Sequence, residues 1–212
     1  MGRRRLHGDD TAEALLDTAE RIVETDGLEA LTVRRVAEGA GTTTRAVYSV
    51  YGSKEGLVVA LGRRAFEYLR TELEALPATD DPAADLVEAG VKVFRRLAID
   101  RPTLLRVGVQ WGTLPDPKLA EGFRLDARQA LASLRARVGR LEESGALGGR
   151  TVVDATREFH ALCEGLAGME LRSLLPAGEA ERIWRDALTT LVRGFSIPRR
   201  TPDKQQDLDK LT

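Results

Sequence analysis

The sequence predicts an all-α protein of about nine helices, with a three-helix helix-turn-helix domain at the N-terminus and a C-terminal helical bundle. Two observations carry this prediction. Apolar residues recur every three or four positions along almost the whole chain, and no segment shows the alternation of a strand. Glycine or proline separates the periodic segments, as at Gly27, Gly41, Gly52 and Pro77. The segments before residue 52 are short and joined by tight turns, which is typical of a helix-turn-helix.

The first helix is expected to begin after Asp10 and to end at Gly27. Asp10 and Glu13 have the spacing of a capping box, in which two side chains satisfy free N–H groups of the first turn. An apolar stripe then continues as far as Val23, and a glycine can take the positive φ that ends many helices. The arginines at 3–5 would precede this helix, either as a solvated, disordered tail or as an arm that reaches a minor groove.

Two short helices are expected next. Thr32 can cap the first, whose apolar positions recur at i, i+3, i+4 and i+7 from Val33. The second begins near Thr43. Its inner face is predicted to hold Ala46, Val47, Val50 and Tyr51, and its outer face Thr43, Thr44, Arg45, Tyr48 and Ser49.

The fourth helix is expected over 54–74, with Ser53 as its cap and Pro77 after its end. At 1.5 Å per residue it would be about 30 Å long, enough to cross from one domain to the next. We therefore divide the chain into a helix-turn-helix domain (1–56), a sensing and dimerisation domain (57–197) and a disordered polar tail (198–212). Further helices are expected over 83–99, 102–113, 116–144, 151–174 and 178–196.

Composition narrows the possible functions. The net charge of −1 argues against a protein coated with basic groups, but it allows a DNA-binding surface confined to one face. Cys163 is the single cysteine, so no internal disulfide or cysteine-rich zinc site can form. The sequence has no cluster of His, Asp or Glu at metal-ligand spacing, and we expect no cofactor. No run approaches the roughly 18 apolar residues of a membrane span, and we expect a cytoplasmic protein without membrane partners.

The outer face of the third helix is suited to DNA. The major groove is about 12 Å wide and admits one helix. Short hydroxyls, one guanidinium and one phenol can contact base edges and phosphates, and no acid on this face would repel the backbone.

The segment 31–57, LTVRRVAEGAGTTTRAVYSVYGSKEGL, resembles the signature of the TetR family of transcriptional regulators, and the resemblance extends over about residues 11–60. It departs from the family pattern at Thr42, where an apolar residue is common, and at Val50, where an aromatic residue or histidine is common. The resemblance implies a DNA-binding set of Thr32, Arg34, Thr43, Thr44, Arg45, Tyr48, Ser49 and Lys54. Tyr48 and Lys54 match positions that clamp phosphates, and Thr44 and Arg45 match positions that read bases.

The C-terminal half is expected to hold a ligand pocket and a dimer interface. Pockets between bundle helices combine large apolar groups with a few polar ones. Our candidates are Phe94, Arg106, Gln110, Trp111, His160 and Glu164. The last two helices resemble the family's dimerisation pair, and 159–171 resembles a subtype named for a Trp-His-Gly pattern. Here Phe159 and Glu164 replace the Trp and the His.

The sequence thus predicts a ligand-responsive regulator, more often a repressor than an activator in such a family. It would bind a pseudopalindromic operator in double-stranded DNA as a homodimer and be released by a small apolar or amphipathic effector. Two alternatives remain open. One is a small helical enzyme that uses His160 and Cys163 as base and nucleophile, although neighbours on one helix turn seldom have the geometry for attack. The other is an adaptor with a vestigial DNA-binding head and no ligand.

Overall fold

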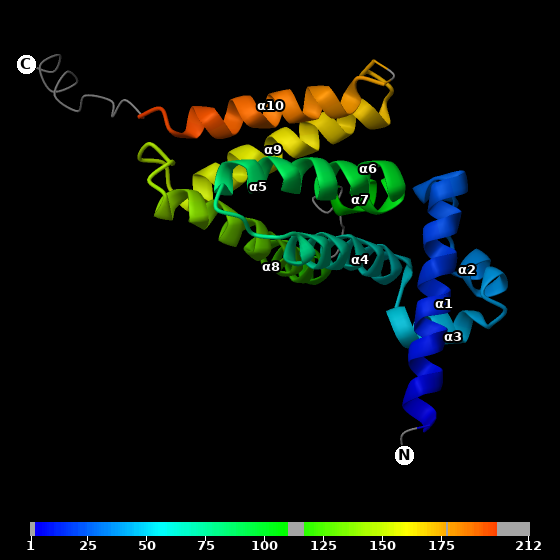
Figure 1. Ribbon diagram of the computed structural model, residues 1–212. Coiled ribbons are helices and arrows are strands. Elements are labelled where there is room, and N and C mark those ends of the chain that lie inside the picture. The colour runs from blue at the N-terminus through cyan, green and yellow to red at the C-terminus, as the bar shows by residue number, and fades with distance from the viewer. Residues whose placement is uncertain (1–2, 110–116, 177, 199–212) are drawn as a thin grey trace, which may run out of the picture.

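The computed structural model describes residues 3–109, 117–176 and 178–198, and the regular secondary structure of this part of the chain is all helical (Figure 1). Three helices form a small head at one end, and the others form a bundle of stacked helices. The elements are α1 (Arg3–Asp26), a 3-10 turn (Leu28–Ala30), α2 (Val33–Gly39), α3 (Thr44–Tyr51), α4 (Lys54–Ala75), α5 (Pro82–Ala89), a π-helical stretch (Gly90–Phe94), α6 (Arg95–Asp100), α7 (Pro102–Val109), α8 (Pro117–Glu143), α9 (Val152–Leu171) and α10 (Ala180–Phe195). Because 82–100 is one continuous helix, the described residues form nine helices, as expected.

The head is organised by capped turns, and the two caps predicted at Thr32 and Ser53 are confirmed. The side-chain oxygens of Thr32, Thr43 and Ser53 accept hydrogen bonds from backbone N–H groups in the first turns of α2, α3 and α4, at donor–acceptor distances of 3.2, 3.3 and 3.1 Å. Gly27 ends α1 with a φ of 83°. Since each cap satisfies a donor that would otherwise lack a partner, short helices can end and restart within a few residues.

The start of α1 differs from the prediction. The helix begins at Arg3, so Asp10 lies inside it rather than capping it, and the arginines at 3–5 belong to the helix instead of preceding it. No proline interrupts this stretch, and Gly8 costs only about 1 kcal/mol relative to alanine in a helix. Nothing in the sequence between Arg3 and Asp10 is strong enough to stop the helix.

Val50 also differs from the prediction, because its side chain is 41% exposed instead of facing inward. It lies in the last turn of α3, just before the chain reverses at Gly52, and no helix covers it. Tyr51 takes the inward role, and its hydroxyl donates a 2.6 Å hydrogen bond to the backbone oxygen of Ala12 on α1.

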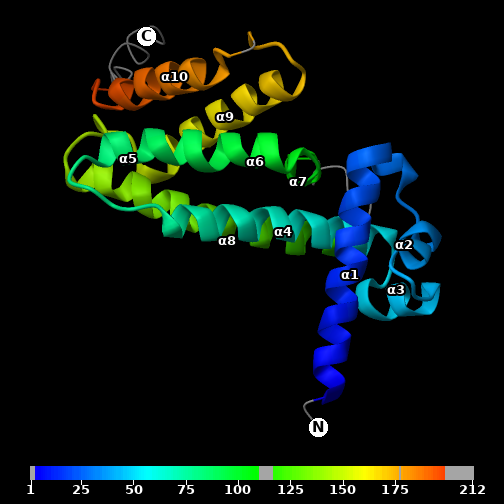
Figure 2. The same cartoon turned by 45° about the vertical axis from the view of Figure 1, so that its right-hand side comes forward.

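The bundle is built around α4 and the hairpin of α9 and α10 (Figure 2). Its largest fully buried side chains include Phe123, Phe159, Trp184 and Phe195. The indole Nε1 of Trp184 donates to Glu170 at 2.8 Å, which satisfies the polar atom of a side chain with no exposed surface. The helices within 117–198 end within a few residues of the predicted limits. The predicted helical residues 110–113 and the tail 199–212 lie outside the described residues.

Two arginines of α8 fix the loop between α4 and α5. The guanidinium of Arg137 donates to the backbone oxygens of Leu73 and Leu76, which lie at the end of α4. Arg140 pairs with Asp85, whose side chain is 7% exposed. The loop is therefore held by charge-assisted hydrogen bonds rather than by apolar packing. No helix in the described part of the chain is long and apolar enough to cross a bilayer.

Asp85 makes the free energy of unfolding depend on pH in the acidic range. Burial raises the pKa of Asp85, but hydrogen bonds from Arg140 and Thr79 outweigh burial and leave this pKa below its ordinary 3.8. A carboxyl whose pKa is lower in the folded state stabilises the fold above its unfolded pKa, and this contribution is lost as the pH falls through the folded pKa. We predict that Asp85→Asn lowers the free energy of unfolding by about 1–3 kcal/mol at neutral pH, because buried donors lose their charged partner.

The measurement is urea unfolding of both proteins from neutral pH down to pH 3. The difference between wild type and variant should begin to shrink below about pH 4, where Asp85 of the unfolded chain takes up a proton, and it should be lost as the pH falls through the lower pKa of the folded state. Asp80→Asn changes an exposed carboxyl of the same loop and should leave the curve unchanged. A difference that does not depend on pH would contradict this account.

The turn from α3 to α4 requires a glycine at position 56. A Cβ at Gly56 would lie 1.8 Å from the backbone oxygen of Tyr51, so an alanine would force the two helices apart. Gly139 on α8 has open space around its Cβ position and is a matched control. We predict that Gly56→Ala destabilises the protein by about 1–3 kcal/mol or more, whereas Gly139→Ala stabilises it by about 0.5–1 kcal/mol. Thermal unfolding measures both, and equal effects would contradict the close contact.

Candidate nucleic-acid interface

The outer face of α3 is held away from the rest of the protein. Val47 is fully buried, whereas the side chains of Thr43, Thr44, Arg45 and Ser49 are exposed. The Tyr48 side chain is 56% exposed, an unusual position for an aromatic ring. One buried aliphatic side chain thus supports a helix whose polar groups face solvent. The predicted outer face is present as a continuous surface.

The turn between α2 and α3 fixes this surface relative to α2. The backbone N–H of Thr42 donates to Ala37 at 2.9 Å, and that of Gly41 donates to Glu38 at 3.1 Å. The Thr43 cap follows directly. Because every residue of the turn is bonded to a neighbouring element, the two helices cannot rotate independently.

The three expected cations differ in how they are paired. Within the described residues, Arg45 and Lys54 form no ion pair, and α3 contains no acid. Lys54 is half-buried at the start of α4. Arg34, by contrast, pairs with Glu38 at 2.8 Å, and the hydrogen bond and charge of Glu38 raise the pKa of Arg34. The Arg34 side chain is still 83% exposed, so a phosphate has to compete only with a weak surface pair.

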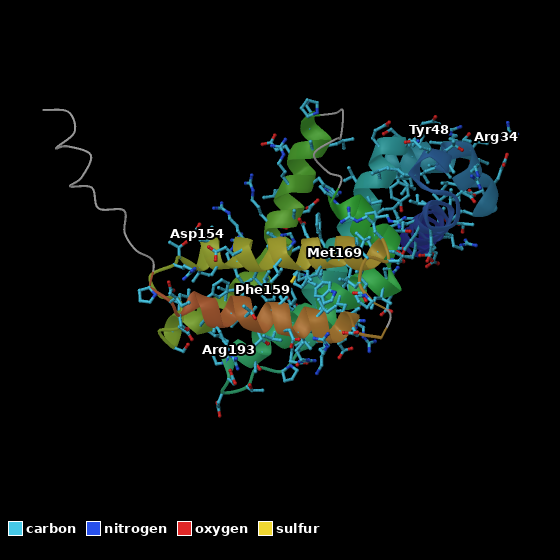
Figure 3. All side chains as sticks on the ribbon, turned by 90° about the horizontal axis from the view of Figure 1, so that it is seen from above. Arg34, Tyr48, Asp154, Phe159, Met169 and Arg193 are labelled. Atoms are coloured by element: carbon cyan, nitrogen blue, oxygen red, sulfur yellow. The ribbon has the colours of Figure 1, made fainter. Side chains whose placement is uncertain are left out.

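Figure 3 shows Arg34 and Tyr48 at the same end of the molecule. Asp154 on α9 and Arg193 on α10 lie at the other end, and Met169 on α9 lies between the two ends. The candidate DNA surface and the last two helices therefore occupy different parts of the protein, so both can be engaged at once.

Two contacts that support the head were missed by sequence analysis. The Tyr51 hydroxyl ties α3 to α1, and burial raises the pKa of this hydroxyl. Arg35 pairs with Asp26 and also donates to the backbone oxygen of Ala30. No local signal predicts either contact, because both join residues that only the fold brings together.

Three of the six candidate ligand residues lie together. Phe94 is buried, with its ring centroid 5.8 Å from that of His160 and 6.2 Å from that of Phe159. His160 Nε2 lies 3.5 Å from Glu164 Oε1. Arg106 is exposed on α7, apart from this group. Gln110 and Trp111 lie outside the described residues.

The proposed pair of His160 and Cys163 is unsuited to nucleophilic chemistry. Cys163 is 1% exposed, and burial raises the pKa of its thiol well above the ordinary value. Burial also lowers the pKa of His160. A thiol attacks as thiolate from an accessible position, so Cys163 behaves as a small apolar core residue.

Comparison with known proteins agrees with this geometry. Residues 15–61 match the family described as "Bacterial regulatory proteins, tetR family". The HTH-type transcriptional regulator EthR of Mycolicibacterium smegmatis (strain ATCC 700084 / mc(2)155) is 30% identical over 115 residues, which are 51% of this chain. The chain spans about half the length of that relative, since the match covers 52% of it.

Solved structures share the fold over nearly the whole chain. A protein of unknown function from Rhodococcus sp. RHA1 aligns with a TM-score of 0.76 and 21% identity, covering 88% of this chain and 95% of that one. The transcriptional regulator FadR from Bacillus subtilis, solved in complex with stearoyl-CoA, aligns with a TM-score of 0.71 and 17% identity, covering 86% and 98%. At these identities the likeness establishes the fold alone.

The matched region contains α2, α3 and the turn that fixes them, and the relative that it resembles in sequence is itself a helix-turn-helix regulator. Members of this family are DNA-binding regulators rather than enzymes. Residues 15–61 therefore correspond to the model of the TetR family of bacterial regulatory proteins.

Proposed function

We propose that the protein is a ligand-responsive transcriptional repressor that binds operator DNA through α3 as a homodimer. The observation that carries the proposal is the exposed face of α3, which presents hydroxyls, a phenol and the unpaired guanidinium of Arg45 without any acid. The head would be residues 1–56 and the sensing domain 57–197. The protein would work in the cytoplasm, where it can reach DNA.

The eight residues of the DNA-binding set would divide their work. Thr44 and Arg45 lie in the first turn of α3, and helices of this kind read base edges with their N-terminal residues. Tyr48 and Lys54 would contact phosphates of the DNA. Arg34 would approach the groove from α2. Thr32, Thr43 and Ser49 would add hydrogen bonds to the sugar–phosphate backbone of the DNA. Phosphate contacts set the register, and base contacts set the sequence.

The effector would bind in the bundle. Phe94 offers an apolar wall beside His160 and Glu164, a combination suited to an amphipathic molecule. FadR of Bacillus subtilis was solved with stearoyl-CoA, which supports an acyl chain as one class to test. Repression would be relieved to the extent that the effector binds the non-DNA-binding arrangement more tightly. Arg106, Gln110 and Trp111 remain candidates from the sequence, and of these three only Arg106 lies within the described residues.

The dimer would form through α9 and α10. On α10 a half-buried stripe of Ile183, Ala187, Leu191 and Gly194 lies beside the fully buried face of Trp184. Such a second apolar stripe is suited to a partner helix. Two-fold symmetry would place the two α3 helices about 34–36 Å apart, one turn of DNA.

Binding of DNA fragments tests the α3 assignment. We predict that Lys54→Ala weakens binding to all sequences and lowers the salt slope by about one unit, because one phosphate contact is lost. Arg45→Ala should instead cost about 1–3 kcal/mol on the selected site and relax its sequence preference.

The control is Arg193→Ala, which removes an exposed cation at the opposite end of the molecule (Figure 3). Fluorescence anisotropy over a range of salt concentrations should show wild-type behaviour for this variant. If Lys54→Ala and Arg193→Ala had the same salt slope, α3 and the start of α4 would not be the DNA surface.

Sedimentation velocity tests the dimer. We predict that Ala187→Glu converts the dimer to a monomer, because it places a charge on the half-buried stripe of α10. Thr189→Glu adds the same charge two residues on, where the side chain faces away from the stripe, and should leave the dimer intact. Dissociation by both variants, or by neither, would count against this interface.

A further inference from the structure

One carboxylate joins the head to two separate parts of the bundle. Glu20 lies on α1. Its Oε2 accepts a 2.9 Å hydrogen bond from Arg64 Nη1 on α4. Both of its oxygens accept 2.9 Å hydrogen bonds from Arg101, through Nε and Nη2. Arg101 lies between α6 and α7, so three segments distant in sequence meet at Glu20.

The triad of Arg64, Glu20 and Arg101 is largely shielded from water. The side chains are 14%, 12% and 35% exposed, respectively. The pairing of Arg101 with Glu20 is bidentate, which restricts direction as well as distance. Surface pairs elsewhere in the protein, such as Arg96 with Asp100 at 4.0 Å, lack both features. Ion pairs removed from water are screened much less by salt, so the triad is a stiff connection.

The triad borders a groove between the head and the bundle. A groove of about 810 Å³ runs between α1, α4 and α8, and both Arg64 and Arg101 line it. Asp17, one turn before Glu20, also accepts a 2.7 Å hydrogen bond from Arg64. Polar bonds therefore join the head to the bundle beside this groove.

Glu20 is well placed to orient the DNA-binding surface. The opposite side of α1 contributes Leu15 and Ala19, both fully buried, to the core shared with α2 and α3. Arg101 is followed by Pro102, the first residue of α7, so the position of its backbone follows that helix. Figures 1 and 2 both show α7 beside α1.

We propose that Glu20 is a positioning residue that fixes the orientation of the head, with Arg64 and Arg101 holding its carboxylate from α4 and from the α6–α7 junction. A shift of α7 then turns α1 and with it α3. The consequence for operator binding rests on the proposed function, whereas the orientation of the head does not.

The experiment measures the distance between head and bundle directly. Spin labels are attached to the exposed positions Glu24 on α1 and Leu174 after α9, each changed to Cys, and labelled chains are diluted with unlabelled ones so that pairs within one chain dominate. Buried Cys163 does not react. Electron–electron resonance then gives the distance distribution. We expect a narrow distribution for the otherwise unchanged chain and a broad or displaced one for Arg101→Gln.

Two further variants separate positioning from general stability. Arg101→Lys keeps the positive charge but loses the bidentate hydrogen bonding of the guanidinium. Its distance distribution should be narrower than that of Arg101→Gln but broader than that of the otherwise unchanged chain. Arg96→Gln removes an exposed arginine of α6 with the same change in charge and should leave the distribution unchanged. If Arg101→Gln fails to fold, Arg101→Lys still tests the proposal, because its distance distribution should be broader than that of Arg96→Gln. Distributions that are identical in the Arg101 variants and in Arg96→Gln would overturn the proposal.

Operator binding supplies a second readout. Arg101→Gln should weaken binding to the selected operator by about tenfold, within the range typical of coupling between sites, while binding to random DNA stays near that of Arg96→Gln. If no duplex is preferred by the wild-type protein, the proposed function fails, yet the distance distributions still decide whether the triad holds the head.

Discussion

Helix α4 cannot move without moving both ends of the molecule, because its first turn is packed under α3 and the rest of it runs through the bundle. Leu57 is buried in the core that it shares with the head, and Leu61, Leu69 and Leu73 are buried farther along the same helix. Gly56 allows the first turn to approach Tyr51. Helix α4 thus connects the surface that would meet DNA to the domain that would meet an effector.

The basic residues of this protein fall into two groups with different physical roles. Arg35, Arg64, Arg137 and Arg140 are committed to carboxylates or backbone oxygens inside the structure. Arg45 has no such partner within the described residues. A guanidinium already held by a carboxylate has little to offer a phosphate, so a chain with a net charge of −1 can still present a DNA surface where its cations are left free.

Local patterns predicted most of the fold because the signals that set helix limits are themselves local. Thr32 and Ser53 cap helices as their spacing indicated, Thr43 caps α3 at the predicted start of that helix, and Gly27 ends α1. The pattern gave the wrong start for α1, since a capping box only favours a beginning and does not prevent the helix from extending. It also placed Val50 inside, because periodicity cannot show that no element covers the end of a short helix.

The outer face of α3 could be predicted because a helix of eight residues has few ways to bury one side. The contacts that hold the head could not, since the pairs of Arg101 with Glu20 and of Tyr51 with Ala12 join distant segments. Many arginines and acids in the sequence could form equally good pairs, and only the three-dimensional packing selects among them. The ligand site is constrained less, because apolar residues of a bundle serve its core and its pocket alike.

The most direct test of the account is the selection of bound fragments from a pool of random double-stranded DNA by the purified protein. The account predicts enrichment of an inverted repeat with half-site centres one helical turn apart, as a symmetric pair of α3 helices requires. Recovery of no preferred sequence at low salt would contradict it, because the exposed face of α3 would then have no duplex to read.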